Sequence, residues 1–187
     1  KGALSNGTNV EHIKTFIQVK LNNSTHLSGI VHIAAGYHAS VFASSNGEVY
    51  TVGLNDKGQL GDGTRYDRNF PVRVRKNNST YLSNVRKAEY RSTYILGCTF
   101  DGDLFGTGLG GGNFGLTAKD RTYYAQYLNS SGYIPKIADI VCSAGNVIMI
   151  TIDNEVYISG TNGNGVYGNG KKSAGDFRPY KVKFNDS

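Results

Sequence analysis

The amino-acid sequence repeats a glycine-rich motif about every 54 residues, a period in the range of solenoids, propellers and other repeat arrays. The clearest copy is KGQLGDGT at 57–64, and the chain begins with a second copy, KGALSNGT, at 1–8. More divergent copies are GGGNFG at 110–115 and GNGVYG at 163–168. The fold is therefore predicted to be built from similar units, in which residues common to all units have structural roles.

Each unit also contains short apolar runs on either side of a turn. Asn-Gly and Asp-Gly between such runs are strong hairpin signals, and 25 glycines in 187 residues disfavour helices. Antiparallel strands are predicted at 40–44, 48–52, 94–98, 103–107, 147–151 and 155–159, with tight turns at 46–47, 101–102 and 153–154. About four strands in each repeat predict an all-β fold of propeller blades.

We expect a single repeat domain over residues 1–187. It contains a partial blade at 1–19 and whole blades at 30–75, 84–128 and 138–184. Because Lys1 aligns with Lys57, the chain is expected to begin inside a repeat. It is therefore expected either to belong to a larger propeller or to form an unusual assembly, with self-association and a missing upstream part of the same protein as the open alternatives.

The segment Val31–Val74 resembles one repeat of the regulator of chromosome condensation family. The matching residues are Ala35-Gly36, His38, Val41-Phe42, Asn46-Gly47, Gly53, Asn55-Asp56-Lys57-Gly58-Gln59-Leu60-Gly61 and Pro71-Val72. The family pattern has Trp before the glycine at position 53, where the three repeats of this chain have Val52, Thr107 and Ser159. The resemblance implies a seven-bladed ring, a structural role for His38, and a style of glycine-rich core similar to repeats of bacterial or viral surface proteins.

The sequence points away from an enzyme. It contains no paired carboxylates, nucleophile–base arrangement or metal-ligand cluster, so we expect no catalytic residue, no metal and no cofactor. The segment 106–111 fits G-x-G-x-x-G, but further turn residues follow it in place of the helix that a dinucleotide site requires. Cys98 and Cys142 are predicted to be buried thiols. No apolar run reaches the ~18 residues of a membrane span.

The net charge of +6 is concentrated in residues 65–91, which contain eight Lys and Arg residues against two acidic ones. Three interpretations remain open: a solvated blade edge, a surface for an acidic protein or glycan, and, least favoured, a nucleic-acid site. Arginine and tyrosine in variable loops are typical of binding contacts. The predicted partner-binding residues are Tyr37, Arg65, Tyr66, Arg68, Arg91 and Tyr123.

The predicted function is a non-enzymatic recognition module of a surface or extracellular protein, of adhesin or fibre type, that engages a protein or glycan through blade loops. The alternative, which the family resemblance implies, is a regulatory propeller that docks another protein. Such a propeller would be similar to a guanine-nucleotide exchange factor or an enzyme inhibitor, with a cytoplasmic or nuclear location.

Overall fold

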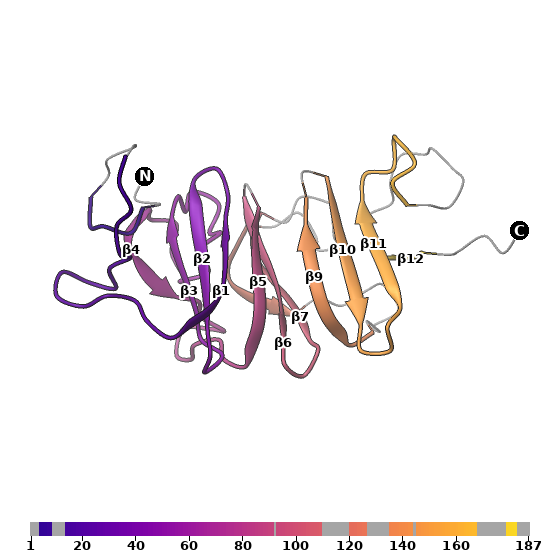
Figure 1. Ribbon diagram of the computed structural model, residues 1–187, viewed down its shortest axis with the longest axis horizontal. Helices are drawn as coiled ribbons and strands as arrows, with labels where there is room; N and C mark the ends of the chain where they lie inside the picture. The colour runs from indigo at the N-terminus through magenta and orange to yellow at the C-terminus, as the bar shows by residue number, and fades with distance from the viewer. Residues whose placement is uncertain are drawn as a thin grey trace, which may run out of the picture.

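The computed structural model describes residues 4–8, 14–91, 93–109, 120–126, 135–143, 145–167 and 179–182. Over these ranges the regular elements are strands, which form three four-stranded antiparallel sheets. Figure 1 shows the sheets side by side along the long axis of the molecule. The first sheet contains β1 (Ile30–Ala35), β2 (Ala39–Ser44), β3 (Val49–Gly53) and β4 (Arg68–Arg73).

The second and third sheets repeat this order. The second contains β5 (Val85–Arg91), β6 (Tyr94–Thr99), β7 (Leu104–Leu109) and β8 (Asp120–Gln126). The third contains β9 (Ile137–Cys142), β10 (Asn146–Thr151), β11 (Val156–Gly160) and β12 (Tyr180–Lys181). The prediction of an all-β fold is confirmed, and the six predicted hairpin strands differ from the observed ones by at most two residues at either end.

The two ends of each blade carry different connections. The β1–β2, β5–β6 and β9–β10 turns lie at the upper end of the blades in Figure 1, and the β2–β3, β6–β7 and β10–β11 turns lie at the lower end. In the first blade, Gly53 pairs with both Ala39 and Arg68. The long β3–β4 loop therefore leaves from the upper end, beside the β1–β2 turn.

The lower turns depend on residues that accept a left-handed backbone. Gly47, Gly102 and Asn154 occupy equivalent positions with φ of 79°, 80° and 61°. Their N–H groups each donate a 3.0 Å hydrogen bond to the carbonyl three residues earlier. Glycine has no Cβ penalty at such angles, and asparagine tolerates them better than most residues. The Asn-Gly, Asp-Gly and Asp-Asn signals in the sequence therefore mark real turns.

Apolar side chains fill the spaces between successive blades. Ala39, Val41 and Ala43 of β2 pack in one buried cluster with second-blade residues such as Ile95 and Phe105. A second buried cluster joins the second and third blades and includes Leu96, Cys98, Ile140, Val147 and Met149. Neighbouring residues of β6 thus face opposite blades, as alternation along a strand requires.

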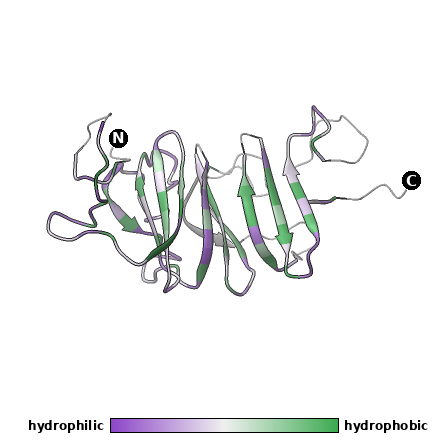
Figure 2. Cartoon of the chain, in the orientation of Figure 1, coloured by the Kyte–Doolittle hydropathy of each residue, from purple (hydrophilic) through white to green (hydrophobic). Residues whose placement is uncertain are grey.

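Among the described residues, no such cluster covers the outer face of the third blade. Ile148 and Ile150 stand at the positions of Leu96 and Cys98, yet they are 44% and 40% exposed. Figure 2 shows this apolar strand, β10, near the right-hand end of the array. The expectation that the chain self-associates or is completed by another part stays a prediction.

The N-terminal segment contacts the first blade in the same way as the first blade contacts the second. Gly7 N–H donates to the carbonyl of Asn69 at 3.2 Å, and the equivalent Gly63 N–H donates to that of Thr122 at 2.8 Å. Residues 4–8 therefore occupy the place of a glycine-rich loop from a preceding blade.

Candidate protein-binding loops

The loop between β3 and β4 is organised by one buried residue, Asn55. Its Nδ2 donates to Asp62 Oδ1 and to the carbonyl of Tyr66, both at 3.1 Å, and its Oδ1 accepts the N–H of Leu60 at 2.9 Å. Leu60 itself is fully buried. The Asn and Leu of the repeat motif are therefore structural, because they close the loop around its own backbone.

Asp62 forms the second anchor of this loop. Its Oδ1 accepts hydrogen bonds from the N–H of Thr64 at 2.9 Å and from Thr64 Oγ1 at 2.7 Å. Its Oδ2 faces Arg68, with Nε at 2.7 Å and the terminal nitrogen at 2.6 Å. The Asp62 side chain is only 5% exposed. The guanidinium of Arg68, which the sequence suggested as a partner contact, thus neutralises a buried carboxylate.

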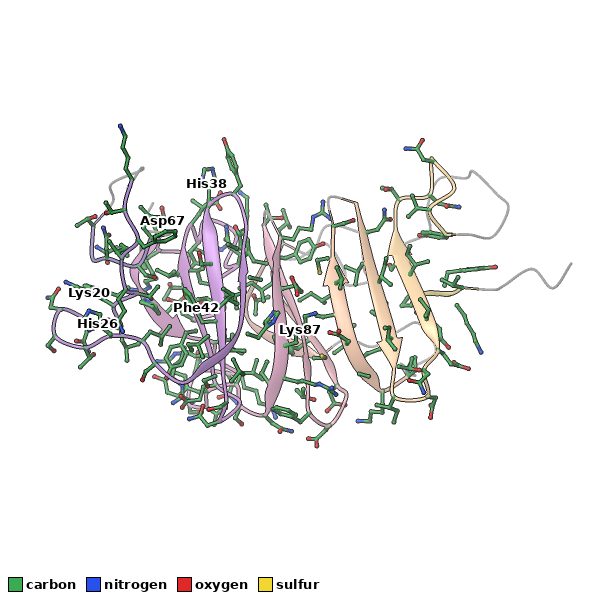
Figure 3. All side chains as sticks on the ribbon, in the orientation of Figure 1. Lys20, His26, His38, Phe42, Asp67 and Lys87 are labelled. Carbon is green, nitrogen blue, oxygen red and sulfur yellow. The ribbon has the colours of Figure 1, made fainter. Side chains whose placement is uncertain are left out.

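Other predicted contacts project from this framework at the upper end of the first blade. Tyr37 is 87% exposed in the β1–β2 turn, and Tyr66 is 74% exposed in the β3–β4 loop. Arg65 is exposed beside Tyr66. The ring of His38 lies 4.1 Å from that of Tyr37, and Figure 3 places His38 and Asp67 along the upper edge. The structure therefore brings Tyr37, Arg65 and Tyr66 to one end.

Arg91 and Tyr123 come from the second blade. Arg91 ends β5 opposite Tyr94, also at the upper end, and its side chain is half-buried. Tyr123 lies in β8, next to Thr122, whose carbonyl accepts the N–H of Gly63. The side chain of Tyr123 is outside the described part, so its role stays a prediction.

The basic window 65–91 does not form one continuous patch. Arg73 pairs with Glu48 at 2.9 Å, and Lys87 pairs with Asp139 at 2.9 Å. Tyr81 lies 4.5 Å and 4.8 Å from the guanidinium carbons of Arg73 and Arg75. Because the window follows strands that run in opposite directions, its charges are spread over both ends of two blades and several are neutralised locally.

Two contacts between blades were not evident from the sequence. A Cβ on Gly36 would meet the Tyr90 ring at 2.1 Å, so the Ala-Gly step leaves room for an aromatic residue of the next blade. The hydroxyl of Thr107 donates to the carbonyl of Gln59 at 2.7 Å. Both pairs join residues about one repeat apart, so the repeat period was the one feature of the sequence that could have indicated these contacts.

The described residues contain no group of three or more His, Cys, Asp and Glu side chains placed to hold a metal ion. Nor does any helix of this part have the length and apolar character needed to cross a membrane. Gly106 and Gly108 of the G-x-G-x-x-G segment belong to strand β7, whereas 110–111 lie outside the described residues. Burial raises the pKa of Cys98 to about 11 and that of Cys142 to about 12, the opposite of an activated thiol.

Four-stranded sheets that pack face to face in sequence order define blades of a β-propeller. Two models of the regulator of chromosome condensation (RCC1) repeat match the chain, at residues 46–90 and 30–59. Residues 30–90 therefore match repeats of the regulator of chromosome condensation family, as the sequence pattern predicted.

Similar proteins include the human probable E3 ubiquitin-protein ligase HERC4, which is 29% identical over 154 residues, covering 82% of this chain and 14% of the relative. Among known structures, human WBSCR16 is 20% identical with a TM-score of 0.73, over 97% of this chain and 45% of that one. Prp20p of Saccharomyces cerevisiae is 18% identical with a TM-score of 0.64, over 85% and 39%. The chain thus spans less than half the length of each, and the structural likeness shows the fold alone.

Proposed function

We propose that this chain is a non-catalytic protein-docking module of the regulatory type. Its contact surface is the upper end of the first two blades, with Tyr37, Arg65 and Tyr66 at its centre and Arg91 and Tyr123 at its margin. The observation that carries the proposal is the exposure of two tyrosine rings at one end, Tyr37 at 87% and Tyr66 at 74%, the latter on a loop that the hydrogen bonds of Asn55 hold in place.

The physical reason is preorganisation. Tyrosine and arginine are enriched among the residues that dominate binding energy at protein interfaces. Binding is weakened when a loop must first become ordered. Asn55 and the Asp62–Arg68 pair fix the backbone of this loop before any partner arrives. A partner would therefore meet the ring of Tyr66 with little further loss of loop entropy.

The proteins of similar structure favour a regulatory docking module over a surface adhesin. Prp20p was studied for its binding to Gsp1p and histones, and yeast RCC1 (Prp20) was crystallised with Kap60. These similar structures support protein partners, and the cytoplasmic or nuclear location remains part of the proposal. Nothing comparable supports a glycan ligand, an acidic ligand or an extracellular role. We carry over neither ligase nor exchange activity, because the chain covers 14% and 39% of the respective proteins.

The test is affinity capture followed by titration of the purified captured protein. The variant Tyr37→Ala/Tyr66→Ala should lose the partner and weaken its Kd by more than about tenfold, or about 1.4 kcal/mol. Tyr81→Ala is the matched control, because Tyr81 is also exposed, at 44%, but follows β4 at the lower end. Equal affinities of the double variant and the wild type would overturn the proposal, as would an equal loss in Tyr81→Ala.

A further inference from the structure

The lower turns of the second and third blades display two apolar side chains in equivalent places. Phe100 is 58% exposed and Ile152 is 59% exposed, whereas the first blade has Ser45 at this position. In all three turns the N–H of this residue donates a 2.9 Å hydrogen bond to the carbonyl of the residue just before the first strand of the same blade, which is β1, β5 or β9. The accepting residues are Gly29, Asn84 and Lys136.

The turns of the first and second blades are also tied to the blade that follows. Val85 N–H donates to the carbonyl of Gly47 at 3.0 Å, and Ile137 N–H donates to that of Gly102 at 2.8 Å. Backbone bonds therefore hold the β6–β7 turn on both sides. Because Phe100 and Ile152 share one position in the repeat, their side chains stand one blade apart along the lower edge.

An aspartate follows each apolar residue. Asp101 accepts a 2.6 Å hydrogen bond from Asn84 Nδ2, and Asp153 is exposed. The nearby Lys136 pairs with Asp103 at 2.6 Å. Within the described ranges, neither Asp101 nor Asp153 has a cation within ion-pair distance. The edge thus presents two apolar–carboxylate pairs, where the first blade has the neutral Ser45-Asn46.

We propose that Phe100-Asp101 and Ile152-Asp153 form a second docking surface, for a basic segment of a partner protein that carries apolar residues among its Lys and Arg residues. Apolar side chains of the segment cover Phe100 and Ile152, which removes exposed apolar surface from water. Its cations meet the two carboxylates, which gives electrostatic complementarity. The same carboxylates repel phosphates and acidic peptides. This surface is at the opposite end from the proposed Tyr37–Tyr66 site and does not depend on it.

The uncharged Ser45-Asn46 turn of the first blade provides the replacement sequence for the test. The variant Phe100→Ser/Asp101→Asn/Ile152→Ser/Asp153→Asn converts both turns to the sequence that the first blade already uses with the same backbone bonds. The probe is a fluorescein-labelled peptide of alternating Lys and Leu, and the readout is fluorescence anisotropy. Wild-type protein should bind saturably, and the variant should bind at least about tenfold more weakly.

Separate variants divide the two contributions. Asp101→Asn/Asp153→Asn should reduce the salt dependence of binding, since it removes the charges that salt screens. Phe100→Ser/Ile152→Ser should weaken binding at every salt concentration. Tyr66→Ala and Asn46→Ala should leave peptide affinity unchanged. Absence of saturable wild-type binding, equal binding of the quadruple variant, or equal binding of a Glu/Leu peptide would each overturn the proposal.

Discussion

The hydroxyl of Thr107 donates a 2.7 Å hydrogen bond to the backbone carbonyl of Gln59, and both residues are buried. The two residues belong to neighbouring blades. Thr107 stands at the position where the repeat family usually has Trp. A polar side chain therefore fastens the glycine-rich loop of the first blade to the second blade at this point.

Replacing Thr107 with Val keeps the shape of the side chain but removes the donor. The carbonyl of Gln59 would then be buried without this partner, and leaving such a group unsatisfied costs about 1–3 kcal/mol. We expect the free energy of unfolding, measured with urea, to fall by that amount. Thr80→Val, at an exposed linker position, is the control and should change it by less than about 0.5 kcal/mol. Equal stabilities of the two variants would contradict the role of this contact.

Two glycines differ in whether the structure leaves room for a side chain. Gly108 has φ of 85°, and an added Cβ would lie 2.3 Å from the carbonyl oxygen of Thr93 and 2.8 Å from Cα of Gln59. Gly163 has nothing within 4 Å of such a Cβ. Gly108→Ala should therefore destabilise the protein by more than about 2 kcal/mol, and Gly163→Ala by less than about 0.5 kcal/mol. Thermal unfolding followed by circular dichroism would show the difference, and similar melting temperatures would rule out the close approach.

In the β3–β4 loop, the structural role of Arg68 can be separated by mutation from the proposed binding role of Tyr66. Arg68→Met leaves the Asp62 carboxylate, 5% exposed, without its cation, so we expect a loss of about 1–3 kcal/mol in the free energy of unfolding. Tyr66→Ala should lose less than about 0.5 kcal/mol, because the ring is 74% exposed. Urea titrations of both variants test this. The assignment would fail if Tyr66→Ala proved the more destabilising change.

The thiols should respond to pH in a defined direction. Burial raises the pKa of Cys98 to about 11 and that of Cys142 to about 12, above the value of about 8.5 for an unfolded chain. The folded state therefore holds these protons more tightly. Stability from this source is complete below about pH 8.5 and declines as the pH rises towards the folded pKa values.

Urea titrations at rising pH should show that decline. At about pH 8, both thiols of the native protein should react with dithiobis-nitrobenzoate at least about tenfold more slowly than in guanidinium chloride. Fast stoichiometric reaction of the native protein would contradict the burial of Cys98 and the partial burial of Cys142, whose exposure is intermediate.

Much of the fold follows from local sequence signals. Asn46-Gly47 and Asp101-Gly102 mark their turns because few other residues accept a positive φ there, and Asp153-Asn154 marks the third turn for a related reason. Alternation also allowed the strands around these turns to be predicted. These features depend on residues next to each other in the chain.

The candidate site was predicted less completely, because its decisive contacts are not local. Arg68 and Asp62 are six residues apart within an irregular loop, so no periodicity indicates that they meet. The packing of Tyr90 on Gly36 joins two blades. The basic window appeared continuous in the sequence, but strand β4 begins at Arg68 and ends at Arg73, so these two arginines lie at opposite ends of one blade.

The hydrogen bond that fastens the glycine-rich loop of the first blade to the second blade has a consequence for synthesis on the ribosome. Thr107 is made 48 residues after Gln59, and at about 5–20 residues per second the interval is of the order of 2–10 s. During that interval the nascent loop has the hydrogen bonds of Asn55 but lacks the hydrogen bond from Thr107. The first blade would therefore mature only after the second has been made, and a chain stalled between them would expose an unfastened loop to chaperones and proteases.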